Sequence, residues 1–178
     1  MQKSLISATV VLVIVFAAIM AAYSAIGSDW LETTAISVGV TLYHFAMRLL
    51  VGLVYHAIFR NRVNYNLMWF RQLPSEQKLY KFLRVKKWKK IVPTFRPDFF
   101  DLEKHSAEEI VGAVCEAELV HETIVPLSFL PVLLIPQFGA AAVFWITSSL
   151  AAAMDITLVI VQRYNRPRLL KLLRKQVR

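Results

Sequence analysis

Long runs without a charged residue constrain the fold of this chain more than any other feature of its sequence. Residues 4–28 contain no Lys, Arg, Asp or Glu, and neither do residues 123–154. An α-helix rises about 1.5 Å per residue, so about 20 apolar residues cross a hydrocarbon core of roughly 30 Å. The runs therefore predict transmembrane helices and favour an integral membrane protein over a soluble one.

The predicted fold class is all-α: a polytopic membrane protein with about four transmembrane helices and cytoplasmic interfacial helices, forming a single domain over residues 1–178. A turn is predicted at Pro136–Gly139, because the apolar block around it is too long for one span. Pro126 and Pro131 should kink the third span, with neighbouring helices satisfying the carbonyl groups that they leave free. We expect spans at about residues 4–27, 33–59, 120–136 and 140–161. A cleaved signal peptide is the alternative for the first, because Lys3 and Ala22–Ser24 resemble its charged start and its cleavage site, but the apolar run exceeds the usual length.

The basic residues are concentrated in two segments. The chain carries 21 Lys and Arg against 12 Asp and Glu, a net charge of +9. Residues 60–122 hold twelve of these bases and residues 162–178 hold seven, whereas residues 27–32 have none. The positive-inside rule therefore predicts a cell-membrane protein with both termini and the segment 60–119 in the cytoplasm. A basic cytoplasmic face favours anionic membrane lipid as a partner, and without a nucleic-acid-binding motif we expect no nucleic acid.

Three cytoplasmic segments have helical signals. Lys78–Val92 interleaves bases with large apolar residues, which is typical of a helix lying in the membrane interface. Ser106 and Glu109 form a capping box, so a helix should begin near Ser106 and continue into the third span. Residues 165–178 predict a short basic amphipathic helix, with Pro167 in its first turn.

Ionisable residues inside spans are costly, so they mark candidate functional sites. Counting about 1.5 Å per residue from the outer ends of the spans places Arg48, Glu118, His121 and Asp155 at similar depth, near the cytoplasmic edge of the core. We expect these four residues to form one buried site. Arg48 is a candidate for binding a phosphate or carboxylate of the substrate or donor, or for neutralising Asp155.

Glu118 and His121 are three residues apart and so lie on one helical face. A carboxylate beside an imidazole orients the ring and raises its basicity, as a general base for a hydroxyl requires. Two other interpretations remain open: a structural ion pair, and a metal-ligand pair of the Glu-x-x-His type. We expect no metal and no cofactor, since only one copy of this motif occurs.

Three blocks of sequence indicate a family. Arg84–Lys89 reads Arg-Val-Lys-Lys-Trp-Lys, Ala117–His121 reads Ala-Glu-Leu-Val-His, and Val161–Leu169 contains Gln-Arg-Tyr-Asn-Arg-Pro-Arg. In order and spacing these blocks resemble the glycosyl-4,4'-diaponeurosporenoate acyltransferase family over about residues 82–170. Where that family has Glu and Arg before the Ala-Glu-x-x-His block, this chain has Ala113 and Glu116.

The resemblance implies a small bacterial membrane enzyme that esterifies the glucose 6-hydroxyl of a glycosylated carotenoid or related glycolipid, with acyl-CoA or an acyl carrier as donor. His121 is then the expected general base and Glu118 the residue that orients it. A non-enzymatic membrane subunit with a structural polar cluster, and a metal-dependent lipid-modifying enzyme, are the alternative functions. Residues expected to bind substrate or donor are Arg48, Asp155, Arg163, Tyr164, Asn165, Arg166, Lys87 and Trp88.

Overall fold

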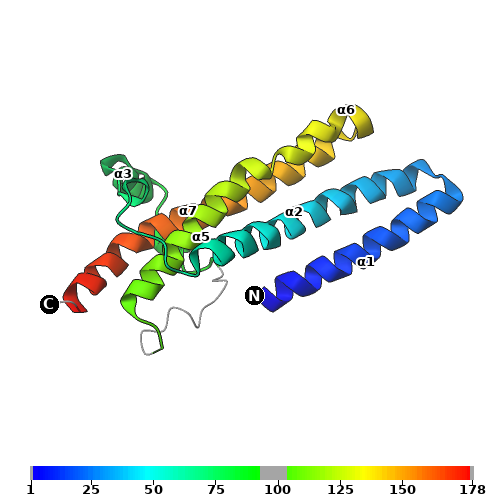
Figure 1. Cartoon of the computed structure of the whole chain (residues 1–178). Helices are drawn as coiled ribbons and strands as arrows, with labels where there is room; N and C mark the ends of the chain where they lie inside the picture. Colours follow the sequence, from blue (N-terminus) through cyan, green and yellow to red (C-terminus); the bar gives the residue numbers. More distant parts are fainter. Residues whose placement is uncertain (1, 93–103, 177–178) are drawn as a thin grey trace. The chain divides into compact units, whose positions relative to one another are not determined.

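The computed structural model describes residues 2–92 and 104–176, and all regular structure within these two ranges is helical. The chain opens with two long antiparallel helices, α1 (Gln2–Ile26) and α2 (Asp29–Phe59) (Figure 1). Gly27 ends the first with a φ of 66°, a left-handed conformation that costs glycine little. The remaining segments are η1 (Met68–Phe70), α3 (Pro74–Phe82), α4 (Val85–Trp88), α5 (Ala107–Leu127), η3 (Leu130–Leu134), α6 (Ile135–Phe138) and α7 (Ala141–Gln176).

Four helical stretches are long and apolar enough to cross a membrane. The third runs through α5, η3 and α6, and the turn after it falls at Gly139 and Ala140, close to the predicted site. The all-α class with four candidate spans is therefore confirmed. The four stretches are Lys3–Ile26, Asp29–Phe59, Ala107–Phe138 and Ala141–Arg174.

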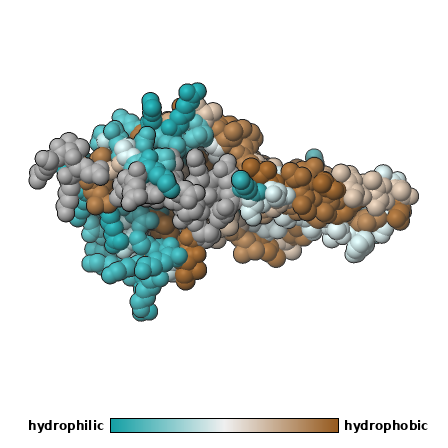
Figure 2. Space-filling view, turned by 90° about the horizontal axis from the view of Figure 1, so that it is seen from below, coloured by the Kyte–Doolittle hydropathy of each residue, from teal (hydrophilic) through white to brown (hydrophobic). Residues whose placement is uncertain are grey.

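The contacts within the chain divide it into two compact units. The apolar unit comprises Gln2–Val51 and Thr123–Met154, and the polar unit comprises the described parts of Gly52–Glu122 and Asp155–Arg178. Hydrophobic side chains cover the helices of the apolar unit, and hydrophilic side chains gather over the polar unit (Figure 2). Large side chains such as Ile14, which is 63% exposed, give the apolar unit a surface suited to lipid.

A hydrogen bond in the apolar unit compensates for a proline. Pro131 has no N–H group to donate to the carbonyl of Leu127, four residues earlier, and α5 ends there. The Tyr43 hydroxyl on α2 donates to this carbonyl over 2.8 Å. The prediction that a neighbouring helix satisfies a carbonyl freed by proline is thus confirmed at this position.

The core of the polar unit joins α5, α7 and the segment after α2. Val63, Phe70, Val111 and Cys115 are buried together, and partly buried side chains such as Leu170 pack against them. Gly112 brings α5 against the segment after α2, because a Cβ at this position would clash with the Asn61 carbonyl oxygen. This contact fixes the start of α5 against the end of α2.

Glu116 holds the same junction by hydrogen bonds. Its carboxylate accepts the Asn61 backbone N–H over 2.6 Å and lies 3.0 Å from Nδ1 of His56. Arg60 and Asn61 both have positive φ values, so the chain reverses sharply here. The Glu116 carboxylate therefore supports a strained turn.

The capping box at the start of α5 is confirmed. The Ser106 hydroxyl accepts the Glu109 N–H over 3.2 Å, and the Glu109 carboxylate accepts the Ser106 N–H over 3.1 Å. This reciprocal pair satisfies two backbone donors at the helix start.

Two expected helices differ from those observed. The interfacial helix expected over residues 78–92 is divided into α3 and α4 at Arg84, which has a φ of 51°. The separate helix expected from residue 165 is wrong, because α7 continues through Pro167 to Gln176. Leu169 and Leu170 pack against the core of the polar unit, and this packing outweighs the helix-breaking tendency of Pro167. Residues 93–103 and 177–178 of the predicted cytoplasmic segments lie outside the described residues.

Candidate active site

Polar side chains from α5 and α7 meet inside the polar unit. On α5, Glu118, His121 and Glu122 share one face because they are spaced at three and four residues. On α7, Asp155 and Arg166 share a face because eleven residues complete about three helical turns. The two helices thus present carboxylates, an imidazole and a guanidinium group to each other.

His121 and Asp155 form the first pair of the site. Nδ1 of His121 lies 2.8 Å from Oδ1 of Asp155. The Asp155 side chain is fully buried, whereas the His121 side chain is 20% exposed. A buried carboxylate at Nδ1 favours the tautomer with the proton there, which leaves Nε2 as a proton acceptor. The pair therefore has the arrangement of a positioned general base.

Glu118 faces arginines. Its fully buried carboxylate pairs with the Arg166 guanidinium, and Nε of Arg163 lies 3.3 Å from its other oxygen. The expectation that Glu118 orients His121 is therefore corrected: Asp155 makes that contact at Nδ1. Burying a carboxylate costs desolvation free energy, and pairing with one arginine offsets only part of it. The second arginine offsets more of this cost.

Arg163 connects Glu118 with two further carboxylates. Its guanidinium lies 3.6 Å from Glu76 and 3.8 Å from Glu122, and it donates to the Trp69 carbonyl over 2.9 Å. The Trp69 indole N–H in turn donates to Glu122 over 2.7 Å. Charges of alternating sign thus run from the buried Glu118 toward the exposed Trp69.

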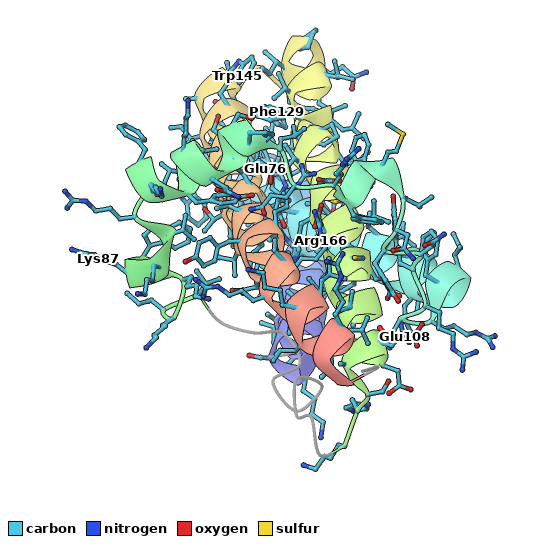
Figure 3. All side chains as sticks on the ribbon, turned by 90° about the vertical axis from the view of Figure 1, so that its left-hand side faces the viewer. Glu76, Lys87, Glu108, Phe129, Trp145 and Arg166 are labelled. Atoms are coloured by element: carbon cyan, nitrogen blue, oxygen red, sulfur yellow. The ribbon has the colours of Figure 1, made fainter. Side chains whose placement is uncertain are left out.

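Arg166 fastens η1 to the site. Its guanidinium, which is 1% exposed, donates to the Phe70 carbonyl and lies 5.1 Å from the Phe70 ring centroid. Figure 3 shows Arg166 in the interior beside α5. Glu118 and a backbone carbonyl therefore share one buried cation, which explains how so large a charged side chain is tolerated without solvent.

Tyr164 and Asn165 hold α4 against α7. The Lys89 ammonium donates to Asn165 over 2.5 Å and lies 4.8 Å from the Tyr164 ring centroid. The Arg168 guanidinium lies 4.7 Å from the same ring and donates to the Tyr164 hydroxyl. Burial lowers the pKa of Lys89 below its usual value, and the charge of Arg168 lowers this pKa further. Both predicted binding residues thus have structural contacts here.

Tyr80 joins α3 to the same cluster. Its ring meets the Tyr164 ring edge-on at 5.5 Å, and its hydroxyl donates to Glu76 over 2.9 Å. Burial raises the pKa of the Tyr80 hydroxyl above its usual range, and the hydrogen bond to Glu76 adds to the rise. The hydroxyl therefore stays protonated and keeps Glu76 turned toward Arg163.

The other predicted binding residues lie elsewhere. Lys87 is exposed and points away from Arg166 (Figure 3), and the Trp88 indole donates to the Leu83 carbonyl over 2.8 Å. Arg48 belongs to the apolar unit, where it donates to the carbonyls of His44 over 2.9 Å and Ala151 over 3.2 Å. Its place beside Asp155 stays a prediction.

The sequence did not identify Glu76, Trp69 and Glu122 as members of the cluster. Glu122 carried a signal, because it lies four residues after Glu118 on the same face of α5. No sequence pattern indicated Glu76 or the Trp69 carbonyl, since they reach Arg163 from segments far away in the sequence. Within residues 2–92 and 104–176, no three His, Cys, Asp or Glu side chains are grouped so that they could hold a metal ion.

These features define a class: an all-α protein with four helices fit to cross a membrane and a polar site built where two of them meet. The family model described as glycosyl-4,4'-diaponeurosporenoate acyltransferase matches residues 56–175, about two thirds of the chain. The chain belongs to this acyltransferase family, and the match contains the whole cluster around Glu118 and His121. No curated protein and no solved structure matches the chain.

Proposed function

We propose that the chain transfers a fatty acyl group to a sugar hydroxyl of a glycosylated carotenoid or related glycolipid, with His121 as general base. The family description names a glycosylated acceptor, and we take the glucose 6-hydroxyl, which the sequence resemblance implies, as the group that is esterified. One observation carries the proposal: His121 is partly exposed while its Nδ1 lies 2.8 Å from the buried Asp155. An imidazole held at Nδ1 in this way keeps Nε2 as the proton acceptor that a general base needs.

The reaction needs one proton transfer in each direction. Nε2 of His121 removes the proton of the sugar hydroxyl as its oxygen attacks the carbonyl carbon of a thioester donor. The new C–O ester bond forms and the C–S bond breaks. The imidazolium then returns the proton to the departing thiolate, so the enzyme ends the cycle unchanged. Asp155 stabilises the imidazolium between these steps.

The arginine cluster supports the other half of the proposal. Arg163 is 22% exposed and contacts Glu118 and Glu122, which lie on the same face of α5 as His121. It is the best placed of the expected binding residues to donate to the acceptor sugar or to the oxygen of the thioester. Arg166 acts through Glu118, and Arg48, Tyr164, Asn165, Lys87 and Trp88 remain candidates for contacts with donor or acceptor.

The proposed topology brings both substrates to this site. A glycolipid tail stays in the membrane and its sugar lies at headgroup level. With both termini and residues 60–119 in the cytoplasm, an acyl-CoA or acyl-carrier donor arrives from the basic side, where its phosphates are attracted. The apolar character of the four helices and the basic character of the polar unit support this arrangement.

The test replaces His121 with Gln and Asp155 with Asn in membranes supplied with the glycosylated carotenoid. Mass spectrometry measures the esterified product, and immunoblotting measures the protein in the membrane. Loss of a general base reduces the rate by about 10²–10⁴-fold. His56→Gln is the matched control, because His56 forms a similar pair with Glu116 but is 49% exposed.

Comparing His121→Gln with His56→Gln separates the proposed catalytic role from a structural role. His121→Gln should abolish most of the product at normal protein abundance, and His56→Gln should not. If His121→Gln retains the wild-type rate, the proposed base is wrong. If product falls only in proportion to protein abundance, the cluster is structural.

A further inference from the structure

The polar unit contains a cavity of about 350 Å³ between η1 and the end of α7. Its walls include Leu67, Met68 and Leu170, and its rim carries Arg71 and Arg174. Arg166 also lines it, and this residue pairs with the buried Glu118. The cavity has the size of a small-molecule site and borders the cluster proposed for catalysis.

The charges of the cavity favour an anion. Three arginines line it, and none of the described residues that line it is acidic. Arg166 is occupied by Glu118 and the Phe70 carbonyl, but Arg71 and Arg174 are exposed and form no ion pair with a described residue. Guanidinium groups bind phosphate through two parallel hydrogen bonds, so two lining arginines without an ion-pair partner among the described residues suit a phosphate ester. The apolar wall suits a stem attached to that phosphate.

The distance from the Arg166 end of the cavity to the level of His121 is close to the length of one such stem. Arg166 lies eleven residues after Asp155 on the unbroken helix α7, which corresponds to about 16 Å along the axis. A phosphopantetheine arm has about 13 bonds between phosphorus and sulfur, and at the 3.3–3.6 Å that an extended chain spans per three bonds it reaches about 15 Å. A phosphate at the Arg166 end of the cavity thus allows the thioester to reach the level of His121. Arg174 lies eight residues further along α7 and must extend its side chain back toward Arg166 to contact that phosphate, in the direction that helical side chains incline.

We infer that this cavity binds the phosphate end of a phosphopantetheine thioester, the acyl donor, through Arg71 and Arg174. The inference rests on the proposed acyl-transfer function and names the donor's binding site. A phospholipid headgroup offers the same phosphate chemistry, and the experiment must distinguish the two sources. Arg71 and Arg174 are positively charged residues that the resemblance to the family did not single out.

The first experiment measures donor binding without turnover. A non-transferable ether analogue of palmitoyl-CoA is titrated calorimetrically into detergent-solubilised full-length protein carrying His121→Gln. Adding Arg71→Gln and Arg174→Gln should weaken binding by about tenfold or more, since each removes a charged hydrogen-bonding partner. The matched control adds Arg60→Gln and Arg62→Gln, which line a separate cavity of about 670 Å³ at the end of α2. This control removes the same charge and should change binding less than twofold.

The second experiment compares donors with the otherwise wild-type enzyme. Acyl-phosphopantetheine should have a kcat/KM about tenfold above acyl-pantetheine, which lacks the phosphate, and Arg71→Gln with Arg174→Gln should remove this difference. Equal use of both donors by the wild-type enzyme overturns the inference, and so does an equal loss of binding in the two double variants.

The third experiment measures competition between lipid and the donor analogue. If phosphatidylglycerol in the micelles displaces the donor analogue, and its own binding is weakened by the Arg71 and Arg174 changes, the cavity is a lipid-headgroup site and the inference is wrong. Failure of the proposed function can be distinguished from failure of this inference. If the proposed function is wrong, His121→Gln retains transfer activity. The binding measurement tests the cavity separately, because it does not depend on transfer.

Discussion

Replacing Arg166 with Met tests how much the buried cation stabilises the polar unit. The Arg166 side chain is 1% exposed and donates to the Glu118 carboxylate and the Phe70 carbonyl. Removing one partner of a buried ion pair costs about 3–5 kcal/mol, and leaving a buried carbonyl without a donor costs about 1–3 kcal/mol. Arg163 still faces Glu118, so we expect the free energy of unfolding to fall by about 4–6 kcal/mol, near the lower sum.

The measurement is thermal unfolding of the full chain in detergent, followed by tryptophan fluorescence. At about 2–4 °C per kcal/mol, Arg166→Met should lower the midpoint by roughly 10–20 °C. Arg166→Lys keeps the charge but loses the fork of donors, so it should cost only about 1–2 kcal/mol. Arg168→Met is the matched control two residues away, because Arg168 is exposed and loses only its contact with Tyr164. Equal midpoints for Arg166→Met and Arg168→Met would refute the reasoning.

Two further substitutions test contacts elsewhere in the chain, both by the same unfolding assay. Gly112→Ala should destabilise by about 1–3 kcal/mol, because the added Cβ meets the Asn61 carbonyl. Gly52→Ala has nothing within 4 Å of the added Cβ and should be neutral or stabilising; similar effects at both glycines would exclude the close approach. Tyr43→Phe leaves the Leu127 carbonyl without its donor and should cost about 1 kcal/mol. An unchanged midpoint for Tyr43→Phe would show that another group satisfies this carbonyl.

The sequence predicted features that depend on local chemistry. Apolar runs long enough to cross a bilayer located four helices, and the capping box of Ser106 and Glu109 located the start of α5. The shared face of Glu118 and His121 followed from their spacing alone. Each of these predictions needs only the geometry of one helix.

Features that depend on the register between helices could not be predicted. Whether Glu118 or Asp155 meets His121 depends on how α7 lies along α5, and residues 122–154 separate the two sides of that contact. The contact between Arg163 and Glu76 could not be predicted either, because the two residues come from segments that share no sequence pattern. The continuity of α7 through Pro167 was missed because tertiary packing outweighed local propensity.

The manner in which η1 is held has a consequence for how this protein can change over evolution. Arg163 and Arg166 bind the carbonyls of Trp69 and Phe70, which every amino acid possesses. Met68, in the same segment, is 85% exposed. The Met68 side chain is therefore comparatively free to vary, whereas the Trp69 indole donates to Glu122 and Phe70 lies in the buried core. An inserted or deleted residue would move both carbonyls away from Arg163 and Arg166, which are also the counterions of Glu118. The segment is therefore constrained in length as well as at the side chains of Trp69 and Phe70.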